Sequence, residues 1–157
     1  MKQIFLFASI ALASGLLFTN IYNSLIDAKS WGADIPNSIE TARNYFKAVN
    51  PGNFFRIFSP LNQILALLVL ILFWKVSPSS RIYLGVALLL YVLGDVFTFA
   101  YFYPRNDIMF KDAQLDEIYT IRNAWIGWNN MNWLRSLIVL IGLIFSFLAL
   151  HKTYSSK

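Results

Sequence analysis

The stretch NAWIGWNNMNWLRSLIVLIGLIFSFLALH, residues 123–151, decides how this chain folds, because its 29 residues contain one charged side chain, Arg135. About 20 apolar residues are enough to cross a bilayer as a helix. The second half of the stretch is almost wholly aliphatic, whereas the first half carries three tryptophans and four asparagines. A charge inside an apolar span is costly and needs a partner. We therefore expect this end of the helix to hold something polar or aromatic inside a membrane.

Three further stretches carry at most one charge each, at residues 3–26, 57–74 and 82–104. The 157 residues are 57% hydrophobic and 13% charged, whereas about a quarter of the residues in a soluble domain are charged. These features predict an all-α fold, a four-transmembrane-helix bundle that forms a single integral membrane domain over residues 1–157. The spans are expected at about 3–27, 58–76, 82–103 and 123–151.

The two longer loops between the spans are predicted to be partly helical. Asn37, followed three residues later by Glu40, is typical of an N-cap pair. Apolar residues at helical spacing then predict a short amphipathic helix that ends at residues 50–52. This helix is expected at the membrane surface, either as a cap over the mouth of the bundle or as a plain connector. A second helical segment is expected over residues 105–122, leading into the fourth span.

The basic residues on one side of this topology have no acidic neighbours, and they are Lys2, Lys75, Arg81, Lys152 and Lys157. The other side mixes seven basic residues with seven carboxylates. Because short loops rich in Lys and Arg stay in the cytoplasm, we expect a multi-pass protein of the bacterial inner membrane with both termini cytoplasmic. The net charge of +5 then reflects topology, and no nucleic acid is expected as a partner. The first 25 residues fit a secretory signal as well, but their apolar run continues into a polar helical face, which favours a retained helix.

Polar and aromatic side chains gather in the outer half of the predicted bundle, on faces that helical spacing brings inward. They are Asn20, Asn23, Asn62, Tyr91, Asp95, Thr98, Phe102, Trp128, Asn132 and Arg135. Asp95 and Arg135 are expected at similar depth, judged from the rise of about 1.5 Å per residue. Each buried charge costs less when paired. We therefore predict that these two residues are within salt-bridge reach, or are joined through one asparagine or water.

Such a cluster has two interpretations, a ligand pocket or a set of polar contacts that holds the helices together. Interhelical polar contacts in lipid contribute about 0.6–2 kcal/mol each, so one or two would suffice for assembly. The larger number here favours a pocket, with assembly alone left open. Trp128 is expected in the pocket wall, whereas the other tryptophans are more typical of interface anchors. One histidine and no cysteine give too few ligands for haem, zinc or iron–sulfur sites, so no metal is expected.

The layout resembles the anthrone oxygenase-like family of small four-helix integral membrane proteins. The likeness rests on YPRN at residues 103–106, on WxxxNxxR at residues 128–135 and on the polar end of the first span. It covers most of the chain, although the motifs are short. In some fungal members the family oxidises a tricyclic anthrone to an anthraquinone with dioxygen, without metal or flavin. The resemblance therefore implies that no cofactor is needed.

If the chain is an enzyme, the resemblance implies a cofactor-independent monooxygenase acting on an anthrone-like or quinol-like substrate. Asp95 is then the expected base, and Arg135 with Asn132 is expected to stabilise the developing oxyanion. The expected substrate-binding residues are Asn20, Asn23, Asn62, Tyr91, Asn106 and Trp128. The rival interpretation is a non-enzymatic membrane protein that binds lipid or quinone, or that is a subunit of a membrane complex. Expected partners are membrane lipids and a small apolar aromatic or lipid-like ligand; whether the chain forms a homo-oligomer stays open.

Overall fold

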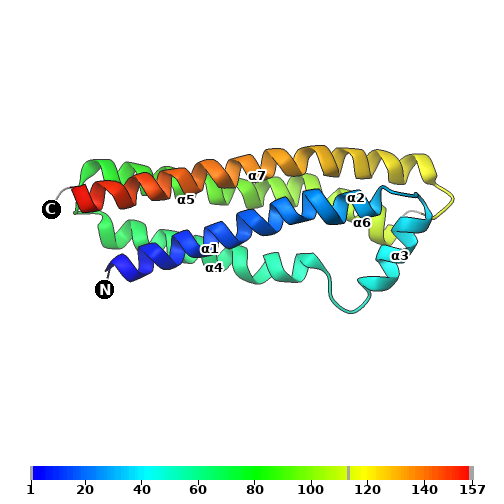
Figure 1. The fold of residues 1–157 in the computed structure, drawn as a ribbon, viewed down its shortest axis with the longest axis horizontal. Coiled ribbons are helices and arrows are strands. Elements are labelled where there is room, and N and C mark those ends of the chain that lie inside the picture. The colour runs from blue at the N-terminus through cyan, green and yellow to red at the C-terminus, as the bar shows by residue number, and fades with distance from the viewer. Residues whose placement is uncertain (1, 113, 156–157) are drawn as a thin grey trace.

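The computed structural model describes residues 2–112 and 114–155, and within these residues it contains helices and no strand (Figure 1). Four helical spans are long and apolar enough to cross a membrane. They are Lys2–Trp31, Pro51–Phe73, Pro78–Lys111 and Ile118–Tyr154, named here the first to fourth spans. The predicted all-α bundle of four transmembrane helices is confirmed.

Two of the spans contain turns of π-helix, in which the chain is wound more loosely than in an α-helix. The first span consists of α1 (Lys2–Tyr22), η1 (Asn23–Asp27) and α2 (Ala28–Trp31). The third consists of α5 (Pro78–Phe97), η2 (Thr98–Phe102), α6 (Tyr103–Asp107) and η3 (Ile108–Asp112). The remaining helices are α3 (Asn37–Tyr45), α4 (Pro51–Phe73) and α7 (Ile118–Ser155). π-turns occur frequently at functional sites.

The four spans form a closed ring in which each contacts its neighbours in sequence. α1 packs on α4 and α7, and α5 packs on the same two helices. Both chain ends lie at one end of the bundle, and α3 crosses the other end (Figure 1). One buried cluster fills the half near the termini and includes Leu6, Val69 and Leu143. A second cluster, which includes Trp31 and Phe102, lies in the opposite half.

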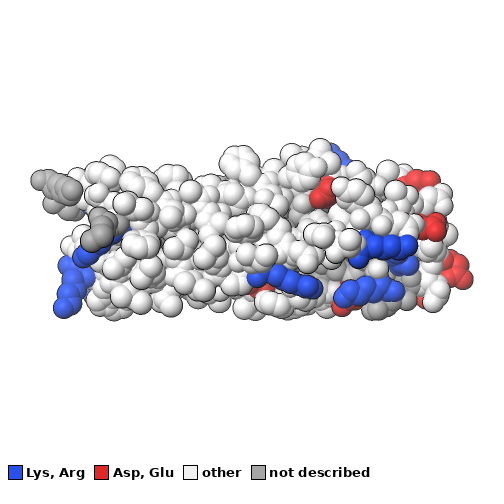
Figure 2. Space-filling view, turned by 90° about the horizontal axis from the view of Figure 1, so that it is seen from below, with Lys and Arg blue, Asp and Glu red and all other residues white. Residues whose placement is uncertain are grey.

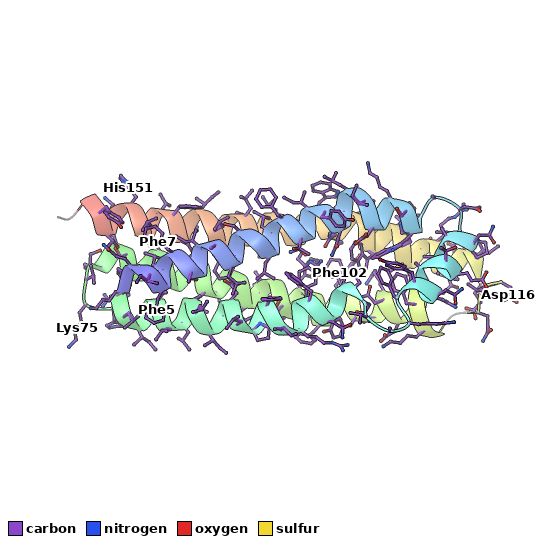
Figure 3. All side chains as sticks on the ribbon, turned by 60° about the horizontal axis from the view of Figure 1, so that its bottom comes forward. Phe5, Phe7, Lys75, Phe102, Asp116 and His151 are labelled. Atoms are coloured by element: carbon purple, nitrogen blue, oxygen red, sulfur yellow. The ribbon has the colours of Figure 1, made fainter. Side chains whose placement is uncertain are left out.

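The outer surface of the spans is apolar, with charged residues gathered toward the two ends (Figure 2). Ile64, Ile71 and Leu89 are each more than 60% exposed. So large an apolar surface is a liability in water and is expected in contact with lipid. The four helices therefore indicate a membrane protein. Lys75 lies at the end of the bundle that carries the termini, whereas Asp116 lies at the other end (Figure 3). Lys157, which was predicted to lie among the basic residues at the end with the termini, is outside the described residues.

Two helix starts differ from the sequence prediction. The predicted N-cap role of Asn37 is wrong, because Pro36 precedes α3 and Asn37 is its first residue, with Nδ2 donating to Asp34 Oδ2 at 2.9 Å. The second span begins at residue 51 rather than at about 58. Its start is fixed by a capping box. The Asn50 side chain accepts a hydrogen bond from the backbone N–H of Asn53, and the Asn53 side chain accepts one from the backbone N–H of Asn50. α4 therefore adds two turns to the outer end of the bundle.

The third span continues through Pro104, where it was predicted to end. Pro104 stands in the first turn of α6, directly after the π-turn η2. Pro104 has no N–H to donate to the preceding turn, and the chain stays helical there because the hydrogen-bond pattern changes at this point from the π-turn η2 to the α-helix α6. The helical segment expected over residues 105–122 is present in two parts. Its first part extends the third span, and its last part, from Ile118, belongs to α7.

Candidate functional site

A cavity of about 760 Å³ lies in the half of the bundle away from the termini. All four spans contribute side chains to its walls, and Tyr91 forms part of its floor where the inner core cluster ends. Ligand sites in proteins usually enclose roughly 300–1,000 Å³, so this cavity has room for a small organic molecule.

Eight of the nine site residues expected from the sequence line this cavity. They are Asn20, Asn23, Asn62, Tyr91, Asp95, Asn106, Trp128 and Arg135. Asn132 is the ninth and is not a lining residue. It is fully buried, and its Nδ2 donates to the backbone oxygen of Asn20 at 2.9 Å and to Ser24 Oγ at 2.6 Å. Asn132 therefore joins the fourth span to the first, and its expected catalytic role has no contact with the cavity to support it.

The carboxylate of Asp95 is held by the second span. Ser59 Oγ donates to one carboxylate oxygen and Gln63 Nε2 to the other, each at 2.5 Å. Ser59 and Gln63 are four residues apart, so both fall on the face of α4 that meets α5. Hydrogen bonds to a charged acceptor are the stronger kind. Asp95 is therefore fixed in position while remaining half-buried at the cavity wall.

The guanidinium of Arg135 lies among aromatic rings. The residue is 6% exposed, and its Nη1 donates to Thr98 Oγ1 at 3.4 Å. Its central carbon lies 4.4 Å from the ring centre of Phe102, 5.3 Å from that of Phe55 and 5.9 Å from that of Trp128. Ring faces attract a cation, and the attraction is larger when water is excluded. This arrangement lets the chain bury the charge without a carboxylate in contact.

The direct ion pair predicted between Asp95 and Arg135 is wrong. No nitrogen of Arg135 comes within 4.0 Å of Asp95, and the salt bridge formed among the described residues joins Lys111 to Asp107 at 2.6 Å. No asparagine side chain hydrogen-bonds Asp95 either; Asp95 is turned toward α4, whereas Arg135 reaches Thr98, one turn further along the third span. The two opposite charges nevertheless attract each other across the cavity. They stand on the walls of one cavity with a gap between them.

An aromatic cluster forms part of the wall of the cavity toward its outer end. The Trp31 ring lies 5.0 Å from that of Phe110 and 5.0 Å from that of Trp128, with edge-to-face geometry in both pairs. Trp31 also lies 6.3 Å from Phe46, just beyond α3. Arg43 on α3 donates from Nε to the backbone oxygen of Met109 at 2.8 Å, which ties α3 to η3. These contacts favour the cap over the plain connector as the role of α3.

Several buried polar atoms around the cavity have no hydrogen-bond partner among the described residues. They are Asn20 Oδ1, Asn62 Oδ1, Trp128 Nε1, Asn132 Oδ1 and Arg135 Nε. Four of these five side chains line the cavity. A buried polar atom without a partner costs about 1–3 kcal/mol, so such atoms are few in folded proteins and often mark a functional site. Among the described residues, no three His, Cys, Asp or Glu side chains are grouped so as to hold a metal ion.

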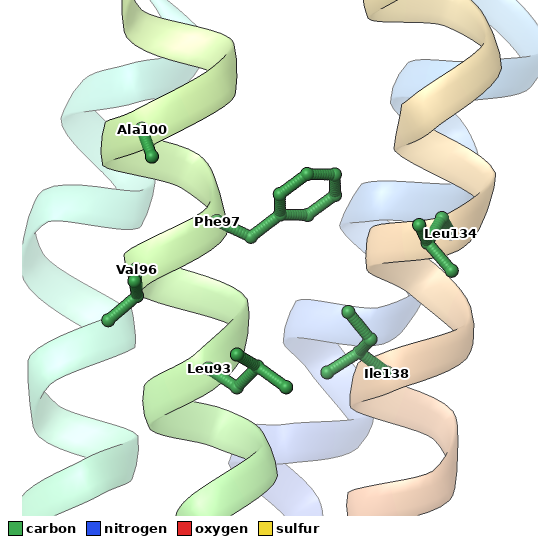
Figure 4. A pocket seen from close by; sticks show the side chains of 6 residues that line it. All are labelled: Leu93, Val96, Phe97, Ala100, Leu134 and Ile138. Carbon is green, nitrogen blue, oxygen red and sulfur yellow. The ribbon is translucent and has the colours of Figure 1, made fainter.

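Asn62 of the second span was expected in the site, but the side chains of that span that hold Asp95 and flank Arg135 were not. Phe55, Ser59 and Gln63 recur every four residues, a spacing that places them along one face of a helix. The signal was present, but the span was expected to begin only at about residue 58, which left Phe55 in the loop. A second hollow, of about 250 Å³, lies between α5 and α7 and is lined by apolar side chains such as Leu93, Phe97 and Ile138 (Figure 4). None of its lining side chains is polar or ionisable.

The family model for anthrone oxygenase matches residues 52–145, which is 94 of the 157 residues. The matched segment contains α4 except its first residue, the third span and most of α7, and with them Asp95 and Arg135. No curated protein and no solved structure matches the chain significantly. The family match covers more than half of the chain, and this chain belongs to the anthrone oxygenase family.

Proposed function

We propose that the cavity binds a small, flat, apolar molecule with a polar edge, and that the protein oxidises such an anthrone-like or quinol-like substrate with dioxygen. The observation that carries the proposal is the placement of Asp95 and Arg135 on the walls of one cavity without contact between them. A carboxylate and a guanidinium separated in this way can act on different atoms of one substrate. The family match supports the same reaction class.

The reaction needs a base and a site that stabilises negative charge. An anthrone loses a proton from its ring CH₂ group to give an enolate, and the proposed acceptor of that proton is the Asp95 carboxylate in the cavity wall. Arg135 stabilises the negative oxygen of the enolate. The enolate carbon then forms a bond to dioxygen, and the proton held by Asp95 passes to the outer oxygen to give a hydroperoxide. Loss of the remaining proton on that carbon, with cleavage of the O–O bond, gives the new carbonyl and releases the outer oxygen as water. The sum is anthrone plus O₂ giving anthraquinone plus water.

The remaining lining residues serve to bind and orient the rings. Trp128 and Phe55 flank Arg135 and offer aromatic faces against which a flat molecule can stack. Asn20 and Asn62 offer side-chain oxygens that lack a partner and could accept hydrogen bonds from phenolic groups. In this account Asn132 positions the first span, and through it Asn20, instead of touching the substrate.

Oxygen uptake and anthraquinone absorbance, measured on the purified full chain in detergent with a panel of hydroxylated anthrones, test this proposal. Replacing the base by Asp95→Asn is expected to lower the rate by about 10²–10⁴-fold. Arg135→Ala is expected to abolish most of the turnover, by about 10²–10³-fold, while the helices still assemble. The exposed residue Asn130 provides a control, Asn130→Ala, that keeps the wild-type rate. Wild-type protein no faster than buffer with every anthrone would refute the proposal.

Binding of a quinone or lipid without turnover is the second candidate. It is favoured by the same unpartnered polar atoms, since they need a polar ligand but not a reaction. Quenching of tryptophan fluorescence by a quinone, with no oxygen uptake from any anthrone, is the result that would support it.

We further infer that the protein lies in an inner membrane with both termini in the cytoplasm, so that the cavity opens away from the cytosol. The support is the short basic connection from Lys75 to Arg81 between the second and third spans. Because the chain has no cysteine, a single cysteine can be introduced at Ser79 or at Asp116. A membrane-impermeant thiol reagent applied to intact cells is expected to label the variant at 116 and not the one at 79; the reverse pattern would overturn the orientation.

A further inference from the structure

The mouth of the cavity is basic. Four of the lining residues near its outer end are Arg43, Lys47, Arg56 and Lys111, and one acidic residue, Asp107, accompanies them. Lys47, Arg56 and Lys111 are exposed, which places them where the cavity meets its surroundings. Four basic residues and one acidic residue therefore line the mouth among the described residues. Figure 2 shows several Lys and Arg side chains at the outer end of one face.

Lys47 and Arg56 supply positive charge that no described carboxylate of the mouth neutralises. Asp107 forms a salt bridge with Lys111, and Arg43 donates a hydrogen bond to the backbone oxygen of Met109. Lys47 and Arg56 form no salt bridge among the described residues. Deeper in the cavity, Asp95 and Arg135 balance each other in charge, so the positive field of the lining comes from the mouth. A neutral flat molecule would gain nothing from such a field.

We propose that the natural ligand carries an ionised acidic group, of the carboxylate type, that lies among these basic side chains while its apolar rings lie deeper, against Phe55 and Trp128. The proposal rests on the proposed function only in that both use the same cavity. Opposite charge at the mouth would raise the capture of such a ligand and fix its orientation, with the reacting edge toward Asp95 and Arg135. The buried Arg135, which is 6% exposed and has a free Nε, provides a second polar end to the same site.

The test compares two ligands that differ in charge and hardly in shape, anthraquinone-2-carboxylate and anthraquinone-2-carboxamide. Both are titrated into the full chain in a neutral maltoside detergent, with quenching of tryptophan fluorescence as the readout, since Trp31 and Trp128 line the cavity. At low salt the carboxylate is expected to bind about tenfold more tightly than the amide, because each partly exposed ion pair adds only a modest factor. The preference should shrink in 1 M salt, where the Debye length is about 3 Å.

Lys47→Gln combined with Arg56→Gln is the deciding variant. It is expected to reduce the carboxylate preference to about twofold or less. The matched control, Lys2→Gln with Lys75→Gln, removes the same charge at the other end of the bundle and should keep the tenfold preference. Equal affinity of the wild type for both ligands would overturn the proposal. So would a preference that survives in the mouth variant or disappears in the control.

Anionic phospholipid is the other source of acidic groups at a membrane surface. If added phosphatidylglycerol abolishes the carboxylate preference while phosphatidylcholine leaves it intact, the basic residues hold lipid headgroups and the proposal is overturned. Persistence of the preference with both lipids supports it. A carboxylate preference without oxygen uptake would refute the proposed oxidation and leave this inference standing. Oxygen uptake without a carboxylate preference would overturn this inference and leave the proposed oxidation standing. Failure of both ligands to bind would overturn this inference, whereas the proposed oxidation stands or falls with oxygen uptake from an anthrone.

Discussion

Replacing Asn132 by alanine separates two roles that the sequence alone cannot distinguish, catalysis and helix pairing. In the structure the Asn132 amide makes two hydrogen bonds to the first span, to the Asn20 backbone oxygen and to Ser24 Oγ. Asn132 is not one of the residues that line the cavity. Asn132→Ala is therefore expected to loosen the pairing of α1 with α7 and to leave the chemistry of each folded molecule largely intact.

The expected loss follows from the two hydrogen bonds. An interhelical hydrogen bond in a membrane protein contributes about 0.6 kcal/mol on average and at most about 1.7 kcal/mol. The Ser24 hydroxyl can turn to a carbonyl of its own helix, which limits the cost of losing its partner. The substitution also removes Asn132 Oδ1, a buried atom that has no partner. We therefore expect the free energy of unfolding to fall by about 1–2 kcal/mol.

Unfolding in mixed micelles of dodecyl sulfate and maltoside, followed by the helical circular dichroism signal, measures this loss. The matched control is Asn130→Ala on the same helix, whose side chain is exposed and accepts a single 3.5 Å contact from Asn129. It is expected to change stability by less than about 0.5 kcal/mol. An Asn132→Ala protein as stable as wild type, but at least a hundredfold slower with an anthrone, would refute the bridging role and restore the catalytic one.

Three further substitutions have defined outcomes. In Gly142→Ala the new Cβ would lie 2.7 Å from Tyr91 Cε1, so the Tyr91 ring must move and its 3.0 Å hydrogen bond to Ser146 is lost. We expect the free energy of unfolding to fall by about 1–3 kcal/mol and quinone binding, measured by fluorescence, to weaken. Gly85→Ala, with open space at its Cβ, should change neither. Gly32→Ala would place a Cβ in steric overlap with the Trp125 ring and disturb the Trp125–Ala28 hydrogen bond, so the thermal midpoint should fall, while Gly15→Ala should not lower it. Ser59→Ala removes a charge-assisted hydrogen bond to Asp95 worth about 1.5–3 kcal/mol, and oxygen uptake should fall at least tenfold, whereas exposed Ser79→Ala should leave it unchanged.

The number of spans and the gathering of polar residues could be predicted because hydropathy and helical spacing act over long stretches. Four apolar runs were enough to define the bundle, and a shared helical face placed Tyr91, Asp95 and Thr98 together. The partner of Asp95 could not be found in this way. Spacing along one helix says which residues share a face, but not which neighbouring helix that face meets.

Asn132 and Arg135 show the same limit for two residues on a single helix. Three residues along an α-helix turn by about 300°, so the two side chains diverge by about 60°. In a closed ring of four helices that angle is sufficient to direct Asn132 to the first span and Arg135 to the third. The π-turns η1 and η2 add a further rotation that no residue pattern announced. Local geometry of this kind decides which polar residues line the cavity.

A ligand-bound structure would show whether the cavity is the substrate site; the measurement is density in the cavity for the protein prepared with a saturating hydroxylated anthraquinone. We expect a flat ring system between the second and fourth spans, with one oxygen toward Arg135 and the opposite edge toward Asp95. Density confined to the lipid-facing surface, or a cavity filled by protein side chains with Asp95 and Arg135 in direct contact, would contradict it.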